Sequence, residues 1–369
     1  MRIAKLISRF IIGLIFIFSG TLKAIDPLGF VYKLQDYFTA FNLDFLSHSA
    51  LFFAIILCTA EFIAGFSVLL NIRLKTGIWI VLILMIIFTP LTLVIALTNP
   101  VTDCGCFGEA IKLTNWQTFL KNVIILIPVI YLFVMRNIIE PHSGTTREWT
   151  ITLIAIVIFI AFILYNLRYL PVIDFLPYKT GTYIPVQMIV PEGKPVDKYE
   201  TTFIYEKDGQ QKEFTLENYP SGDTTWRFIE QRSVLVSKGY QPPVHDFSFY
   251  SLDGIDRTPE ILESDNYLML MISKRLSEAD PEKLEEGFEL GQFCLKNRIG
   301  FFILTASGKE EAERFSKGSI ICLGDETTLK TMVRADPGYI LLKSGIIQGK
   351  WSWAGLPDKE KFKRILNIL

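Results

Sequence analysis

The feature that most constrains this chain is the segment from Thr76 to Val101, which contains no charged residue. A helix rises about 1.5 Å per residue, so about 20 apolar residues cross the roughly 30 Å hydrocarbon core of a bilayer. Further apolar segments of similar length lie at about residues 9–25, 50–70, 117–136 and 149–168. The sequence therefore predicts five transmembrane helices that have the lipid bilayer as their surroundings.

Basic residues at the ends of these segments predict the orientation of the chain. Three groups share one side of the predicted membrane: Arg2, Lys5 and Arg9, then Arg73 and Lys75, then Arg136 and Arg147. Short loops rich in Lys and Arg stay on the cytoplasmic side, although two lysines on the opposite side weaken the bias. We expect a multi-pass protein of a bacterial inner membrane, with a cytoplasmic N-terminus and a periplasmic or otherwise extracytoplasmic domain after about residue 170.

The charge balance and the positions of the histidines argue against two classes of function. The chain has 37 basic and 38 acidic residues and a net charge of −1, so no excess of positive charge attracts nucleic acid. Its three histidines are scattered, and none lies close enough in sequence to the cysteines to complete a tetrahedral metal site. We therefore expect neither a nucleic-acid partner nor a bound metal.

A cysteine pair follows the third apolar segment, in the sequence Asp-Cys-Gly-Cys-Phe-Gly at residues 103–108. Cys104 and Cys106 can form a strained disulfide if Gly105 adopts a backbone conformation that other residues avoid. Strained and exposed disulfides are the reactive ones, and they persist in oxidising compartments. The alternative is a structural bridge, or two inert thiols in a tight turn. The pair is the candidate redox site.

An ionisable residue, Glu61, lies inside the second apolar segment, where an unpaired charge is costly. Lys23, near the outer end of the first segment, is the candidate partner. Small residues next to Glu61, among them Gly65, allow another helix to approach closely. The pair either locks the bundle or serves a proton or quinone function, so the cofactor is left open with a quinone as the candidate. Cys58 in the same segment is expected to be structural.

Between the first two segments, Phe30, Leu34, Phe38 and Phe41 recur at helical spacing. Lys33 and Asp36 occupy other faces of the same stretch. This pattern predicts an amphipathic helix lying on the outer membrane surface.

Past Arg168 the chain becomes polar, and two regions follow. Residues 180–240 predict a small strand-rich lead-in, and residues 242–369 alternate between strands and helices. A strand–helix–strand unit, a hairpin and a final helix predict an α/β domain in three layers around a sheet of mixed strand direction. Cys294 and Cys322 fall in its apolar segments and are expected in the core.

The first ~140 residues resemble the DoxX and MauE (methylamine utilisation) group of four-helix membrane proteins. The matching features are Gly-Leu-Ile-Phe-Ile-Phe-Ser-Gly-Thr-Leu-Lys at 13–23, Ala60-Glu61 with Gly65, and the Asp-Cys-Gly-Cys-Phe-Gly block, which favours MauE. The resemblance implies a four-helix core over residues 1–140, with residues 149–170 as a fifth helix. It also implies that the protein helps a thioredoxin-like partner to form or isomerise disulfides while an exported enzyme matures. Cys104 and Cys106 would be the redox pair.

Residues 242–369 resemble a membrane-anchored thioredoxin-like domain. The sequence Val-His-Asp-Phe-Ser-Phe-Tyr-Ser-Leu-Asp-Gly from residue 244 is similar to the opening of such domains, and Pro337 stands where the family has its cis-proline. The Cys-x-x-Cys that the family carries after the strand ending at Ser273 is missing. The resemblance therefore implies a degenerate thioredoxin fold, better suited to binding than to catalysis.

Together these features predict a membrane all-α helical bundle followed by an α/β thioredoxin-like soluble domain. The leading hypothesis is a protein that assists extracytoplasmic thiol–disulfide or electron transfer in the maturation of exported proteins, with an exported client or a redox protein as partner. The first alternative is a non-enzymatic membrane scaffold whose soluble domain binds a partner. The second is a quinone-linked subunit of an oxidoreductase. Any enzymatic activity would be of the thiol–disulfide oxidoreductase kind.

Overall fold

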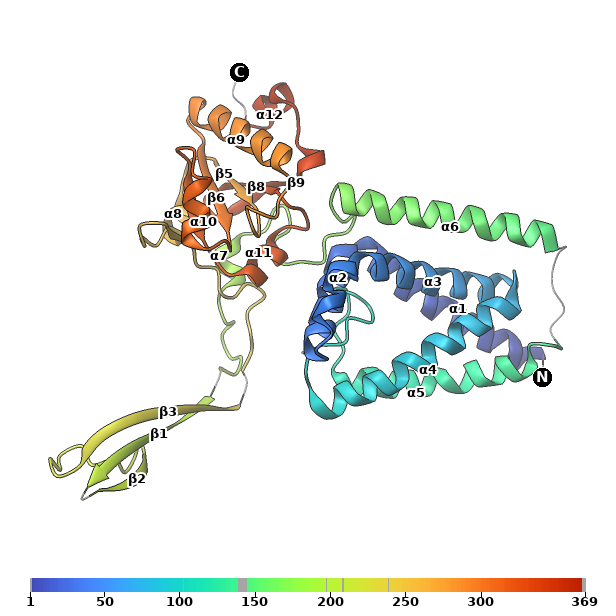
Figure 1. The fold of residues 1–369 in the computed structure, drawn as a ribbon, viewed down its shortest axis with the longest axis horizontal. Coiled ribbons are helices and arrows are strands. Elements are labelled where there is room, and N and C mark those ends of the chain that lie inside the picture. Colours follow the sequence, from blue (N-terminus) through green and yellow to red (C-terminus); the bar gives the residue numbers. More distant parts are fainter. Residues whose placement is uncertain are drawn as a thin grey trace. The chain divides into compact units, whose positions relative to one another are not determined.

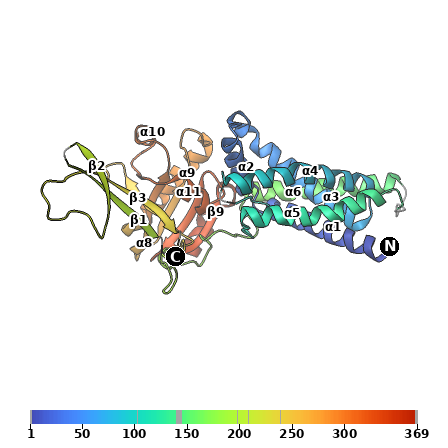
Figure 2. The ribbon, with the colours of Figure 1, turned by 90° about the horizontal axis from the view of Figure 1, so that it is seen from below.

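The computed structural model describes residues 2–101, 103–138, 145–196, 198–207, 209–237 and 239–366. Within these residues, five helices are long and apolar enough to cross a membrane: α1 (Arg2–Ile25), α3 (Ala50–Leu70), α4 (Leu74–Thr98), α5 (Asn115–Met135) and α6 (Thr145–Arg168). Figure 1 labels these helices, and Figure 2 shows them running side by side. The prediction of five apolar helices in the first half of the chain is confirmed.

Helices α1 and α3 approach each other closely because glycines lie at their contact. A Cβ atom added at Gly65 would lie 2.6 Å from the backbone nitrogen of Ile17, and one added at Gly13 would lie 2.6 Å from the Cβ of Leu69. Real Cβ atoms do not come so close to their neighbours, so the packing requires residues without a side chain. The close approach predicted from Gly65 is confirmed, and it brings the polar residues of the two helices within reach of each other.

Helix α2 (Pro27–Ala40) runs across one end of this bundle (Figure 1). It begins after Asp26, whose carboxylate caps the first turn, and its proline stands at the first helical position. Phe30 and Leu34 are buried in one apolar cluster with Cys58 of α3. The amphipathic helix expected between the first two spans is present, but this apolar face packs on protein. A short 3₁₀ helix, η1 (Asp44–Ser49), leads on to α3.

The C-terminal domain is built on a six-stranded sheet in the order β4-β7-β6-β5-β8-β9. Its strands are β4 (Tyr250–Ser251), β5 (Leu268–Ile272), β6 (Gly300–Thr305), β7 (Ile320–Leu323), β8 (Gly338–Lys343) and β9 (Ile346–Ser352). β5, β6 and β7 are parallel, whereas β8 pairs antiparallel with β5 and β9 antiparallel with β8. The mixed strand direction expected from the sequence is confirmed.

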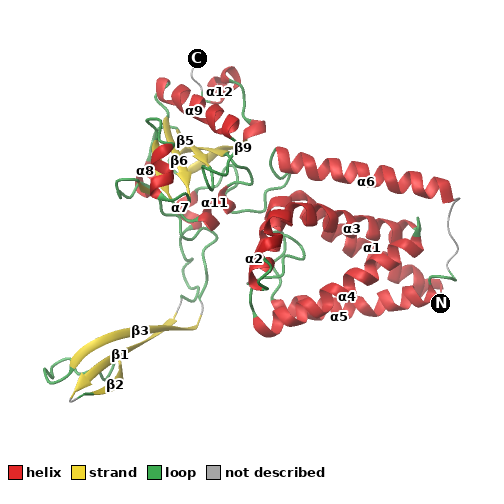
Figure 3. Cartoon of the chain, viewed as in Figure 1, coloured by secondary structure: helices red, strands yellow, loops and turns green. Residues whose placement is uncertain are grey.

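Helices pack against this sheet (Figure 3): α8 (Thr258–Glu263), α9 (Pro281–Lys296), α10 (Lys309–Arg314), α11 (Glu326–Met332) and α12 (Lys359–Ile365), with a 3₁₀ turn η2 (Trp353–Gly355). Every residue of β5 is buried, as expected for a central strand covered on both faces. α9 contributes Phe288 and α12 contributes Phe362 to the main apolar core. Cys294 is fully buried in that core and Cys322 is fully buried in β7, so both thiols are packing residues.

Residues Tyr183–Phe247 form a separate compact unit. It holds a short helix, α7 (Ile184–Gln187), and an antiparallel sheet in the order β2-β1-β3, made of β1 (Lys198–Lys207), β2 (Gln210–Thr215) and β3 (Arg227–Ser237). Aromatic side chains hold this small sheet together, with Tyr205 against Phe214 and Phe228.

A membrane helical bundle followed by an α/β domain is therefore the fold class of this chain.

Candidate functional site

The cysteine pair lies in the loop between α4 and α5. α4 ends at Thr98, because Asn99 takes a left-handed φ of 47° and a proline follows. Gly105 has a φ of +65°, the conformation that a reactive Cys-Gly-Cys turn was expected to need. The Sγ atoms of Cys104 and Cys106 lie 2.7 Å apart. This loop therefore holds two free thiols within hydrogen-bonding distance of each other.

Helix α2 holds the loop in place. The hydroxyl of Tyr37 donates a hydrogen bond to the carbonyl oxygen of Cys104 at 2.7 Å, and the ammonium of Lys33 lies 3.0 Å from the carboxylate of Asp103. The stem of Lys33 also covers Gly105, where an added Cβ would lie 3.1 Å from its Cγ. Two contacts from successive turns of one helix thus hold the two residues that precede the glycine.

A buried ion pair lies beneath the loop, between α1 and α3. The Nζ of Lys23 lies 2.6 and 2.7 Å from the two carboxylate oxygens of Glu61, and both residues are only 4% exposed. The hydroxyl of Ser19 lies 2.8 Å from Glu61 and also 2.8 Å from the carbonyl oxygen of Cys106. The two polar residues singled out inside the predicted spans therefore meet, and Ser19 connects them to the cysteine loop.

A cavity of about 250 Å³ opens between these groups. Its wall is mostly aromatic and aliphatic, and its polar lining comes from both cysteines, the Lys23–Glu61 pair, Ser19, Tyr37, Lys121 and Asn122. The Nζ of Lys121, on α5, lies 4.5 Å from the centre of the Phe107 ring. The two cysteines and the Lys23–Glu61 pair therefore line the same, mostly apolar cavity.

The two thiols differ in acidity. The pKa of Cys106 is lowered to about 6, because the Cys104 thiol donates a hydrogen bond to its thiolate and the Lys121 ammonium attracts the negative charge. The pKa of Cys104 is raised, because its proton is held in that hydrogen bond and because the thiol is buried. Of the two thiols, Cys106 is therefore the one that ionises first, and Cys104 is the one that keeps its proton.

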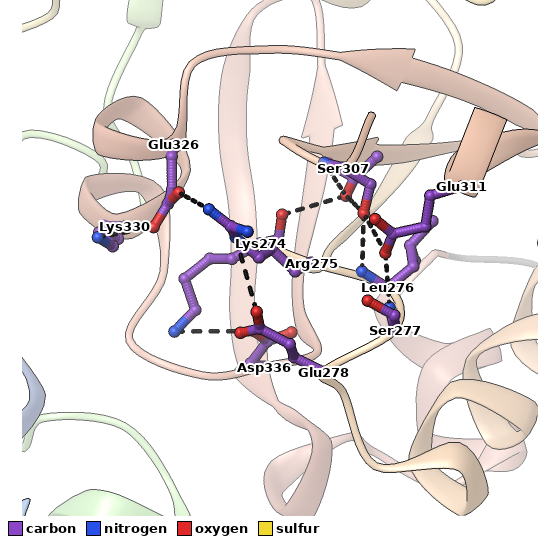
Figure 4. A network of polar contacts seen from close by, with 11 residues as sticks. Lys274, Arg275, Leu276, Ser277, Glu278, Ser307, Glu311, Glu326, Lys330 and Asp336 are labelled. Carbon is purple, nitrogen blue, oxygen red and sulfur yellow. Dashed lines mark hydrogen bonds and ion pairs between the residues drawn. The ribbon is translucent and has the colours of Figure 1, made fainter. Parts of the chain in front are cut away.

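The corresponding place in the C-terminal domain has no thiol. The loop after β5 reads Lys-Arg-Leu-Ser from residue 274, and Figure 4 shows its polar groups tied to neighbours. The Leu276 amide donates to Ser307 and the Ser277 amide donates to Glu311. The Asp336–Pro337 peptide bond is cis, and Ser273 donates a hydrogen bond to the Asp336 carboxylate at 2.7 Å. The sheet order with a cis-proline before β8 is that of a thioredoxin-like domain.

This edge of the domain contacts the membrane bundle. The Lys274 ammonium donates to the hydroxyl of Tyr32 on α2 at 2.9 Å. Arg334 lies 3.0 and 2.9 Å from the two carboxylate oxygens of Asp26, and both side chains are buried. Asp26 caps α2, so the same helix that holds the cysteine loop also receives the C-terminal domain.

Several of these site residues were not singled out by sequence reasoning. Tyr32, Tyr37, Lys121 and Arg334 carry no local pattern that marks them, and Ser19 belongs to the matching block 13–23 without a function of its own being expected. Their partners lie tens to hundreds of residues away in sequence, so only the tertiary packing brings them together. One signal could have found part of the site. Lys33 and Lys121 are charged residues in or next to apolar segments, at the end of the bundle that carries the cysteine loop.

The fold and the site define a multi-pass membrane protein with a cysteine pair at the end of its helical bundle and a thioredoxin-like C-terminal domain without the family's thiols. Residues 1–135 match the family model described as methylamine utilisation protein MauE, and residues 199–238 match a domain of unknown function, DUF8463. The membrane bundle is thus similar to MauE, the resemblance that the Asp-Cys-Gly-Cys-Phe-Gly block indicated.

Two individual proteins are also similar to the chain. "Protein TlpB" of Flavobacterium psychrophilum is 32% identical over 132 residues, which are 35% of this chain and 36% of that protein. The chain thus spans about a third of the length of this relative. A solved structure titled "C-terminal domain of putative thiol-disulfide oxidoreductase from Bacteroides thetaiotaomicron" is 22% identical, covering 33% of this chain and 90% of that one with a TM-score of 0.27.

Proposed function

We propose that this protein is a membrane thiol–disulfide oxidoreductase that passes oxidising equivalents through Cys104 and Cys106 to exported client proteins. The observation that carries the proposal is the paired geometry of the two sulfur atoms, 2.7 Å apart, and the lowered pKa of Cys106 supports it. The proposal includes the orientation expected from the basic residues, in which the cysteine loop lies on the extracytoplasmic face of a bacterial inner membrane.

The acidity of Cys106 favours the oxidising direction. A thiolate with a low pKa is a good leaving group and stabilises the reduced form, which makes the disulfide a stronger oxidant. A client thiolate attacks Cys104, the S–S bond breaks, and its electron pair leaves on Cys106. A second client thiolate then attacks the mixed disulfide, which releases the oxidised client and leaves Cys104 to take up a proton. Two electrons pass from the client to the pair.

The C-terminal domain has a supporting part in this proposal. Its loop after β5 offers Lys274 in place of a nucleophilic thiol, and that lysine is engaged with Tyr32 of α2. Burial raises the pKa of Cys294 and of Cys322 to about 12, so neither thiol reacts at neutral pH. We propose that the domain positions the client and steadies α2, while the chemistry takes place at the membrane loop.

The redox state of the pair in cells tests the proposal directly. Alkylation trapping of the full chain should find Cys104 and Cys106 partly disulfide-bonded, and Cys104→Ala with Cys106→Ala should abolish client oxidation while leaving the protein at its normal level in the membrane. The matched control is Cys294→Ala with Cys322→Ala, which removes two buried thiols and should keep the activity. Full function of the Cys104/Cys106 double variant would refute the redox function.

A specific observation favours the scaffold as second candidate. The Arg334–Asp26 ion pair is buried and joins the thioredoxin-like domain to α2. A protein whose only task is to hold that domain at the membrane needs this contact and does not need the thiols. The same double variant separates the two candidates, because a scaffold keeps its function without Cys104 and Cys106 and a thiol–disulfide oxidoreductase loses it.

A further inference from the structure

The cavity between the cysteine loop and the ion pair has the composition of a site for an apolar ring with polar substituents. Most of its lining is apolar, including Phe16, Phe30, Leu34, Phe38, Met85 and Ile125. The charged pair lies at its wall, where Lys23 and Glu61 satisfy each other. Ligand sites combine an apolar lining with a few convergent polar groups in this way.

The size of the cavity sets the size of its occupant. A dry apolar cavity of about 150 Å³ accepts benzene. The volume here is about 250 Å³, which leaves room for a substituted ring and for the first part of a side chain. Aromatic side chains such as Phe16 and Phe38 can stack against the faces of such a ring, and the ammonium of Lys121, which also lines the cavity, can donate a hydrogen bond to an oxygen on its edge.

The proposed thiol chemistry requires an acceptor for the electrons that each client delivers. The reduced pair must lose two electrons before it can oxidise another client. The cavity that contacts both sulfur-bearing residues lies among helices long enough to cross a bilayer, so the acceptor is a lipid-soluble molecule. Resting on the proposed function, we infer that this acceptor is a membrane quinone, bound in the cavity between the Cys104–Cys106 loop and Lys23.

The step balances in electrons and protons. The Cys106 thiolate and the Cys104 thiol form a disulfide bond, and the two electrons released pass to the quinone ring. The proton of Cys104 goes to one quinone oxygen. A second proton comes from the Lys121 ammonium, which lines the cavity, is partly exposed and then recovers a proton from the aqueous face. The products are the disulfide and one quinol, and the Lys23–Glu61 pair stays intact throughout.

The inference is tested with the full chain in lipid nanodiscs, reduced and kept free of oxygen. A short-chain ubiquinone is added, and quinone loss is followed by absorbance while thiol loss at Cys104 and Cys106 is followed by alkylation and mass spectrometry. We expect one quinone reduced for each pair oxidised, and no quinone reduction by the Cys104→Ala, Cys106→Ala variant.

Two neighbouring substitutions on α4 supply the matched control. Met85 lines the cavity and is 4% exposed, whereas Ile86 is 59% exposed. Met85→Trp fills the cavity and should slow quinone reduction by about 100-fold, because a ring displaced by an ångström no longer meets the thiolate. Ile86→Trp adds the same group on the outside and should react as the wild type does. Oxidation of Met85→Trp by diamide should remain normal and shows that the variant is folded.

Binding supplies a readout that does not depend on turnover. The short-chain ubiquinone should raise the melting temperature of the full-length Cys104→Ala, Cys106→Ala protein, because a ligand that binds only the folded state stabilises it. Equal quinone rates for Met85→Trp and Ile86→Trp, or a pair that diamide oxidises and quinone leaves reduced, would overturn the quinone assignment and leave the thiol–disulfide function standing. A pair that neither reagent oxidises to a disulfide would overturn both.

Discussion

At the scale of single residues, the proposed reactivity of this protein depends on how one glycine places two thiols. The sequence predicts the Cys-Gly-Cys turn and the positive φ at Gly105, because glycine adopts that conformation without the steric cost of a Cβ atom. It does not predict which sulfur becomes the thiolate. That outcome depends on the hydrogen bond from Cys104 and on Lys121, which lies in the second turn of α5 at a distance from Cys106 that no local pattern specifies.

The first prediction concerns the acidity of Cys106. In the reduced protein, its rate of labelling by iodoacetamide should reach half its plateau near pH 6 and stay level above about pH 7, since the reactive thiolate is already formed. Lowering the pH through 6 protonates the thiolate and slows the reaction. Cys104→Ala removes the hydrogen-bond donor and should move the midpoint upward, towards the ordinary thiol value of about 8.5.

Cys294 and Cys322 are the internal controls for this measurement. Their pKa values are raised to about 12 by burial, so both should label only after denaturation. Mass spectrometry of the separate cysteine peptides reads all of these sites in one sample. A midpoint near pH 8.5 for Cys106 in the wild type and in Cys104→Ala alike would contradict the prediction.

At the scale of helices, the sequence predicts the spans and the ion pair between two of them, whereas the cavity follows from the packing of the helices. Long apolar segments predict the five helices. The single acid inside α3, Glu61, needs a partner of opposite charge, and Lys23 of α1 is the candidate that the sequence offers. The cavity could not be predicted in this way. Its shape is the space left when side chains from α1, α2, α3, α4 and α5 meet, so it depends on every one of their packing angles.

The second prediction concerns the ion pair between α1 and α3. Glu61→Gln leaves the Lys23 ammonium buried without its carboxylate, which should lower the free energy of unfolding by about 3–5 kcal/mol. Lys23→Met combined with Glu61→Gln removes both charges and should recover most of that loss. The measurement is unfolding in detergent micelles, followed by circular dichroism.

Cys58→Ala is the comparison for this variant, because Cys58 is also buried in α3, one turn from Glu61. It removes a small side chain without leaving a charge unpaired, so its cost should be about 1 kcal/mol. Equal stability of the Glu61→Gln and Cys58→Ala proteins would show that the ion pair has no special part in the bundle.

At the scale of the whole chain, α2 connects the thioredoxin-like domain to the cysteine loop. Arg334 holds its first residues through Asp26, Lys274 holds Tyr32 in its middle, and Tyr37 near its end holds the backbone of Cys104. The sequence predicts both folds that α2 joins, and even the loss of the Cys-x-x-Cys, but not this connection. Arg334 and Asp26 lie at opposite ends of the chain, and nothing local to either marks the other as its partner.

The last prediction follows from that connection. Arg334→Met leaves the carboxylate of Asp26 buried without its counter-ion, so the contact between α2 and the domain should weaken. We expect faster proteolysis in the connection at residues 169–182, and a change in the labelling rate of Cys106, because α2 is no longer held at its start. Arg334→Met with Asp26→Asn removes both charges and should restore part of the protection.

The matched control for this prediction is Arg232→Met, because Arg232 also forms an ion pair, with Glu230, but both side chains are exposed. Exposed pairs of this kind contribute about 0–1 kcal/mol, so this variant should behave as the wild type in both assays. If Arg334→Met is cleaved faster while Cys106 labels at the wild-type rate, the domain is attached through α2 without influencing the thiols. The C-terminal domain would then act on the client alone, and the coupling of its position to the redox pair would have to be abandoned.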